Sequence, residues 1–114
     1  ILRRLTVKTI KIIDTINSEF AVSPEDGDLV FSKIEECIKK SMPICLDFDG
    51  VDLTTTAFLN TAIGTLYREF DKDTLNKFIS MKNISNSDLT LVKTVIERAK
   101  LTFTDELKEE FGDE

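Results

Sequence analysis

Residues 43–70, PICLDFDGVDLTTTAFLNTAIGTLYREF, contain the pattern that decides the fold. The apolar run 43–48 lies between a proline and an Asp-Gly pair, which is typical of a short, buried central strand. Residues 49–53 are expected to form a turn. A helix capped by one of the three threonines is expected next, because apolar side chains recur there at spacings of three and four residues. These apolar side chains are Phe58, Leu59, Ala62, Ile63, Leu66, Tyr67 and Phe70.

Upstream of this stretch, the sequence predicts a strand, a short extended segment and a helix. Residues 5–13 are rich in β-branched side chains, which favours a strand, and residues 16–22 form a second short strand or an extended loop. Ser23 is a good N-cap for the helix that follows, and Pro24 suits its first position. Gly27 weakens its first turn, so the regular helix is expected to begin nearer Asp28. The apolar face of this helix comprises Val30, Ile34, Cys37 and Ile38.

Downstream, residues 71–77 are expected to form a short helical turn and residues 78–83 a strand. A final helix follows the polar loop 85–87, and Asp88 in its first turn suits the positive end of the helix dipole. The last segment, residues 102–114, is acidic and is expected to be a frayed tail. The apolar stripe of the final helix comprises Leu89, Val92, Val95, Ile96 and Ala99.

Strands separated by helices predict an α/β fold in which right-handed crossovers join parallel strands. The length of 114 residues fits one domain, with a core over about residues 5–101. No repeat, low-complexity segment or interdomain linker divides the chain. We therefore expect residues 1–114 to form a single α/β domain.

The composition argues against several classes of function. The net charge of −6 disfavours binding to nucleic acid, and the basic residues near the start are interpreted as solvated surface charge. Histidine is absent, which removes histidine-based nucleophile systems and the commonest zinc ligand. With only two cysteines, neither a disulfide framework nor a four-thiolate metal site is expected. No cofactor is expected. A further hypothesis is a domain that binds a small molecule or nucleotide, but no glycine-rich phosphate loop supports it.

Nothing in the sequence indicates association with a membrane. No apolar run approaches the roughly 18 residues that a spanning helix needs. No signal-peptide pattern opens the chain. Cys37 and Cys45 are interpreted as reduced, buried side chains. The protein is therefore expected to be cytoplasmic.

Asp47 and Asp49, in the segment LDFDGV, support an enzymatic hypothesis. An apolar strand ending in Asp-x-Asp-Gly-Val resembles the first motif of the haloacid dehalogenase superfamily. That resemblance implies a Mg²⁺-dependent phosphotransferase, with Asp47 as nucleophile and Asp49 as acid/base. The superfamily also needs a later acidic pair at a strand end, and no such strand follows Lys82. The alternative is a strand-to-loop corner with two solvated carboxylates.

The longer stretch 43–70 resembles the central signature of STAS domains. The segment 46–51, LDFDGV, matches the end of their apolar strand, and Leu59 matches the first core leucine of their helix. A further likeness is to STAS-like domains of unknown function from bacteria and phages, in which a segment similar to residues 57–60, AFLN, replaces the usual Ser-Ser-Gly-Leu. The resemblance covers most of residues 5–101. It implies an α/β fold in which helices pack on a mixed sheet of about four strands.

STAS domains of the anti-sigma factor antagonist type are regulatory modules and not enzymes. The resemblance therefore implies a non-enzymatic module that binds a protein partner, such as a histidine-kinase-type ATPase or an anti-sigma factor. In that class the partner phosphorylates a hydroxyl at the helix N-terminus, where a phosphate is favoured. Alignment on Leu59 puts Thr56 and Thr55 at this place as candidate phosphoacceptors. Partner contacts are expected from the surface around residues 49–60, namely from Asp49, Asp52, Thr54 and Asn60.

Three positions depart from the STAS pattern. Thr55 replaces its aspartate, Ala57 its second serine and Phe58 its glycine. A phosphorylation switch depends on the geometry of these positions. The alternative interpretation of residues 54–56 is therefore simple capping of the helix.

Overall fold

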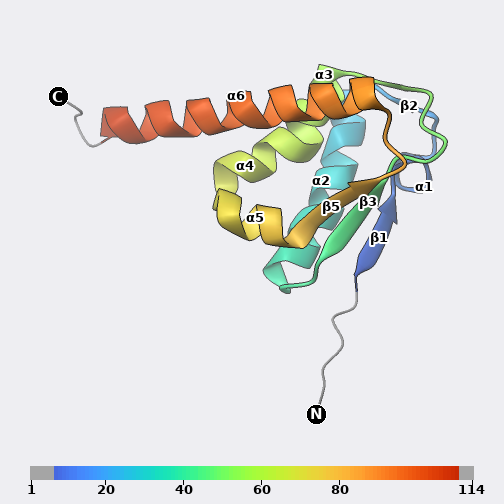
Figure 1. The fold of residues 1–114 in the computed structure, drawn as a ribbon, viewed down its shortest axis with the longest axis horizontal. Helices are drawn as coiled ribbons and strands as arrows, with labels where there is room; N and C mark the ends of the chain where they lie inside the picture. The colour runs from blue at the N-terminus through green and yellow to red at the C-terminus, as the bar shows by residue number, and fades with distance from the viewer. Residues whose placement is uncertain (1–6, 111–114) are drawn as a thin grey trace, which may run out of the picture.

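The computed structural model describes residues 7–110, with side chains described as far as residue 100. Its elements alternate between short strands and helices (Figure 1). In chain order they are β1 (Lys8–Lys11), α1 (Ile12–Ile16), β2 (Phe20–Ala21), α2 (Pro24–Lys39), β3 (Ile44–Asp47), β4 (Leu53–Thr54), α3 (Thr56–Leu59), the π-helical η1 (Asn60–Gly64), α4 (Thr65–Glu69), α5 (Lys72–Phe78), β5 (Ile79–Lys82) and α6 (Asn86–Glu110).

The strands confirm the predicted α/β class and divide into two sheets. The larger sheet has the order β1-β3-β5, and the smaller one pairs β2 with β4. We expected about four strands in one mixed sheet, whereas every strand pair among the described residues is parallel. The connections explain this difference, because at least one helix separates the two strands of each pair and no hairpin joins them.

The larger sheet buries one face against the helices. Ile10, Ile44 and Leu46 belong to the hydrophobic core, together with residues of α2, of the helix after β4 and of α6. Side chains alternate between the two faces of a strand. Accordingly Cys45 is only partly buried and Ser80 is exposed. The predicted strand 43–48 is thus confirmed as the central strand β3.

The first predicted strand is shorter than expected, because the chain turns into helix α1 at Ile12. Residues 5 and 6 lie outside the described part. Ile12 and Ile16, one helical turn apart, are both buried in the core. β-branched residues favour strands only weakly, and here their burial in the core outweighs that preference.

Helix α2 begins at Pro24, and Ser23 is its N-cap as predicted. The expected start near Asp28 is wrong. Gly27 lies inside the helix, where a Cβ would be 2.7 Å from the carbonyl oxygen of Phe58. Gly27 therefore lies where α2 packs closely against α3 and η1, and its missing side chain allows this packing.

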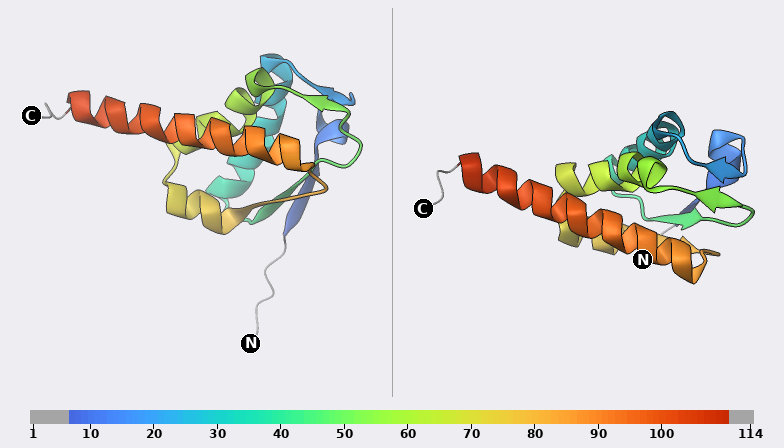
Figure 2. Two further views of the ribbon diagram at one scale, coloured as in Figure 1. Left: turned by 45° about the horizontal axis from the view of Figure 1, so that its top comes forward. Right: turned by 90° about the horizontal axis from the view of Figure 1, so that it is seen from above.

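Segments α3, η1 and α4 follow one another without a break and form the helix predicted after the central strand (Figure 1). The apolar side chains predicted for its buried face are buried, except that Phe70 is partly exposed. Helix α6 runs along this helix and extends beyond it (Figure 2). The tail expected from residue 102 is helical as far as Glu110, and residues 111–114 of this tail lie outside the described part.

Candidate functional site

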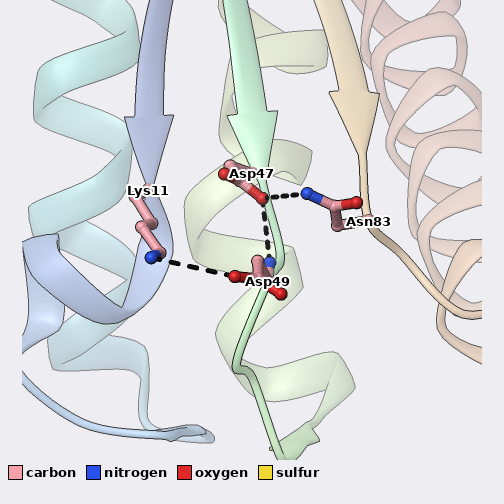
Figure 3. A network of polar contacts seen from close by, with 4 residues as sticks. All are labelled: Lys11, Asp47, Asp49 and Asn83. Carbon is pink, nitrogen blue, oxygen red and sulfur yellow. Dashed lines mark hydrogen bonds and ion pairs between the residues drawn. The ribbon is translucent and has the colours of Figure 1, made fainter.

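The carboxyl ends of the three longer strands carry a network of polar side chains (Figure 3). Asp47, the last residue of β3, accepts through Oδ1 from the side-chain amide of Asn83 and from the backbone N–H of Asp49, both at 2.9 Å. Lys11 Nζ at the end of β1 lies 3.8 Å from Asp49 Oδ2. Asn83 adopts a left-handed conformation with φ 58°, which asparagine tolerates. The network joins residues from three strand ends.

These contacts stabilise the ionised form of Asp47. The hydrogen bond from Asn83 contributes most to lowering the pKa of Asp47, and the N–H of Asp49 contributes next. Burial of the carboxyl group opposes this effect, while Lys82 and Lys11 lower the pKa slightly further. Asp47 is therefore charged at neutral pH. Its two hydrogen bonds connect the loop after β3 with the end of β5.

The phosphotransferase hypothesis requires Asp47 and Asp49 to point into one open pocket beside a lysine. Oδ1 of Asp47 instead accepts from two donors, and Asp49 is exposed and paired with Lys11. Two surface pockets lie beside β1 and α2, and neither carboxylate lines them. Within the described residues, no group of three or more His, Cys, Asp or Glu side chains could hold a metal ion. The geometry favours the strand-to-loop corner.

The three consecutive threonines before α3 are held differently. Thr54 is buried and its hydroxyl donates to the carbonyl of Ala21 at 3.1 Å, so the predicted role of Thr54 as a partner contact does not fit its position. Thr55 is the N-cap, as the capping interpretation predicted. Its Oγ1 accepts from a backbone N–H of the first helical turn at 3.3 Å and donates to the Val22 carbonyl at 2.8 Å.

Thr56 differs from Thr55 in how its hydroxyl is used. It is partly exposed, and no hydrogen bond of its hydroxyl occurs among the described residues. The hydroxyl of Thr55, in contrast, makes two hydrogen bonds that stabilise the fold. Of the two candidate phosphoacceptors, Thr56 is therefore the one that could be modified without breaking a hydrogen bond.

Phe20 and Leu53 form an exposed apolar pair on the β2–β4 sheet. They are register partners in this parallel pair, so their side chains lie side by side on one face. Phe20 is 49% exposed and Leu53 is 52% exposed, whereas the next partners, Ala21 and Thr54, are buried. Adjacent large apolar side chains on a surface are typical of contact sites for other proteins.

Acidic side chains lie close to this pair in the chain. Glu19 directly precedes Phe20, and Asp52 directly precedes Leu53. The backbone N–H of Asp52 donates to the Glu19 carbonyl at 2.9 Å, which brings the two acidic residues together. Both are exposed, as is Asp49 in the same loop. Exposed acidic residues therefore stand next to both members of the apolar pair in the chain.

Sequence reasoning missed Lys11, Phe20 and Asn83, which all lie outside residues 43–70. Their partners are more than thirty residues away in the chain. Asn83 is the last residue of the predicted strand 78–83, and side chains at the carboxyl ends of parallel strands meet at one edge, so this residue could have been found. The predicted contact Asn60 is exposed in η1, and within the described residues no side-chain hydrogen bond connects it with the loop after β3.

The fold and this site define a class: a small α/β domain in which a loop and a capped helix follow the central parallel strand. The family described as "STAS-like domain of unknown function (DUF4325)" matches residues 26–89, more than half of the chain, and the chain belongs to this family. No curated protein and no solved structure matches the chain. In the described part, no helix has the length and apolar character needed to cross a membrane.

Proposed function

We propose that the protein is a non-enzymatic regulatory module of the STAS type that binds a protein partner through the β2–β4 sheet and the loop after β3. This docking face comprises Glu19, Phe20, Asp49, Asp52 and Leu53. The exposed Phe20–Leu53 pair is the observation that carries the proposal. Covering the exposed halves of two such side chains would contribute roughly 2 kcal/mol to association.

The acidic residues of the docking face determine which partner it suits. Glu19, Asp49 and Asp52 are exposed and carry like charge. Charges at the rim of an interface mainly steer association and exclude partners of the same sign. We therefore expect the partner to present an apolar pocket bordered by basic residues.

The STAS resemblance supports a kinase-like ATPase, of the anti-sigma factor type, as the partner. Thr56 lies three residues after Leu53 and has an uncommitted hydroxyl. Phosphorylation there would add a charge of about −1.5 to −2 beside an already acidic face. The added charge would change the affinity of the docking face for its partner, which is the behaviour of a switch.

We place this function in the cytoplasm, without a nucleic-acid or membrane partner. Cys37 and Cys45 are free thiols, as expected in a reducing compartment. The net charge of −6 opposes binding to nucleic acid and to anionic lipid surfaces.

Intact-mass spectrometry tests the switch. The protein is purified after co-expression with the products of neighbouring genes, and any adduct with the mass of one phosphate is mapped. We expect a phosphate on Thr56 that disappears in Thr56→Ala. A base-labile adduct on Asp47 would instead support the phosphotransferase, and a complex without any adduct would support a docking module that is not switched.

A further inference from the structure

A groove runs along the outer edge of β1. Within the part of the chain that the structure describes, β1 is an edge strand, because only β3 pairs with it. A pocket of about 230 Å³ lies beside this edge, between β1, α1 and α2. A second pocket of about 150 Å³ continues toward the end of α2. Lys8 and Lys33 line both pockets, so the two form one groove.

Positive charge dominates the first of these pockets, although the whole chain carries a net charge of −6. Lys8, Lys11 and Lys33 line it, against Asp14 as its acidic residue. Lys11 is paired with Asp49 on its other side. Lys8 and Lys33 are exposed, and neither forms an ion pair with any described residue. Two uncompensated lysines therefore converge on the groove, one from the sheet edge and one from α2.

The backbone of β1 offers hydrogen bonds to this groove. The N–H of Lys8 donates to the Pro43 carbonyl at 2.9 Å, which shows that Lys8 directs its backbone toward β3. In a parallel pair, alternate residues point their backbone groups to opposite edges, so those of Thr9 point into the groove. Among the described residues, no other element bonds to the Thr9 backbone, whereas the Lys11 carbonyl accepts from the Thr15 hydroxyl at 3.1 Å.

We propose that this groove binds an acidic, extended peptide segment of a partner protein, which adds to the sheet as a strand beside β1. Backbone hydrogen bonds to Thr9 would hold the segment, and its carboxylates would pair with Lys8 and Lys33. Ile10 and Cys37 also line the groove, but they are only 3% and 6% exposed, so the apolar contact that they offer a peptide is small. This proposal does not rest on the docking face, although Lys11 lines the groove and also pairs with Asp49 of that face.

Fluorescence anisotropy of the full chain tests this proposal. The probe is a labelled peptide of about eight alternating Glu and Val residues, long enough to run past the four-residue strand. We expect Lys8→Glu and Lys33→Glu each to weaken binding roughly tenfold, and added salt to weaken it further. Lys93→Glu, at an exposed position of α6, is the matched control and should bind like the wild type.

Amide hydrogen exchange tests strand addition separately from charge. The exchange of the Thr9 N–H should slow when the peptide binds. Failure of the peptide to bind, or equal weakening by Lys93→Glu, would overturn the proposal. If tripolyphosphate at matched ionic strength displaces the peptide and the Thr9 exchange is unchanged, the groove is an anion site and strand addition is wrong.

Discussion

The side-chain amide of Asn83 donates to Oδ1 of Asp47 at 2.9 Å, across the carboxyl ends of two adjacent parallel strands. The same oxygen accepts from the Asp49 N–H, which begins the loop that leads to the docking face. A residue that resembles a catalytic nucleophile in the sequence thus has a positioning role in the structure. The position of the loop depends on this carboxylate.

Replacing Asn83 by glycine tests how much this contact stabilises the fold. Glycine keeps the left-handed backbone without strain, so Asn83→Gly removes the amide while also making the unfolded chain more flexible, an effect that the control below shares. We expect a loss of about 1–2 kcal/mol in the free energy of unfolding, measured by urea denaturation, since the acceptor is charged. Asn17 has the same φ of 58° without a side-chain hydrogen bond among the described residues. Asn17→Gly is therefore the control, and an equal loss there would contradict the account.

The lowered pKa of Asp47 makes stability depend on pH in a defined direction. Because the folded-state pKa lies below the ordinary value of about 3.9, the ionised carboxylate stabilises the fold above about pH 4. This stabilisation is lost as the pH falls through the folded-state pKa. The difference in free energy of unfolding between wild type and Asp47→Asn should therefore shrink below about pH 4. A ¹³C NMR titration that gives the Asp47 carboxyl a pKa at or above the ordinary value would contradict this prediction.

Gly27→Ala distinguishes tertiary packing from helix propensity. In an exposed helix, this change stabilises by up to about 1 kcal/mol. Here the new Cβ would lie 2.7 Å from the Phe58 carbonyl oxygen, so we expect a loss of roughly 1–3 kcal/mol in thermal or urea unfolding. Ser32→Ala, at an exposed position of α2, should change stability by less than about 0.5 kcal/mol. A more stable Gly27→Ala variant would show that the two helices do not approach so closely.

Thr55 and Thr56 should respond differently to alanine. Thr55→Ala removes the N-cap and the bond to the Val22 carbonyl, and should cost about 1–2 kcal/mol in urea unfolding. Thr56→Ala should cost less than about 0.5 kcal/mol, because its hydroxyl makes no hydrogen bond among the described residues. A cost of about 1–2 kcal/mol for Thr56→Ala as well would show that its hydroxyl is engaged and not free for modification.

The strand β3 and the helix after it could be predicted because their signals are local. Burial of a short apolar run and a helical period are both visible within the stretch 43–70. The pair Phe20–Leu53 could not, since it joins segments more than thirty residues apart. The contact between Asp47 and Asn83 also joins distant segments, but the parallel order of the strands would have indicated it. The two-residue strand β4 is too short to show the alternation of apolar and polar side chains by which a strand is predicted.

Local reasoning also gave the wrong role for Gly27. Helix propensity treats a glycine as a weak point, whereas its value here depends on the neighbouring helix. The same limit applies to Thr54, which resembles its two neighbours in the sequence but is buried against Ala21. At both positions, burial and tertiary contacts determine the role of the residue.

The most direct test of the docking face measures its affinity for a partner. Isothermal titration calorimetry would compare wild type, Phe20→Ser and Val7→Ser with a kinase-like ATPase encoded by a neighbouring gene. Val7 is 52% exposed, like Phe20 at 49%, but precedes β1 at the amino end of the sheet. We predict that Phe20→Ser weakens the complex at least about tenfold and Val7→Ser leaves it unchanged. No complex with the wild type, or equal affinities for all three proteins, would contradict the docking face.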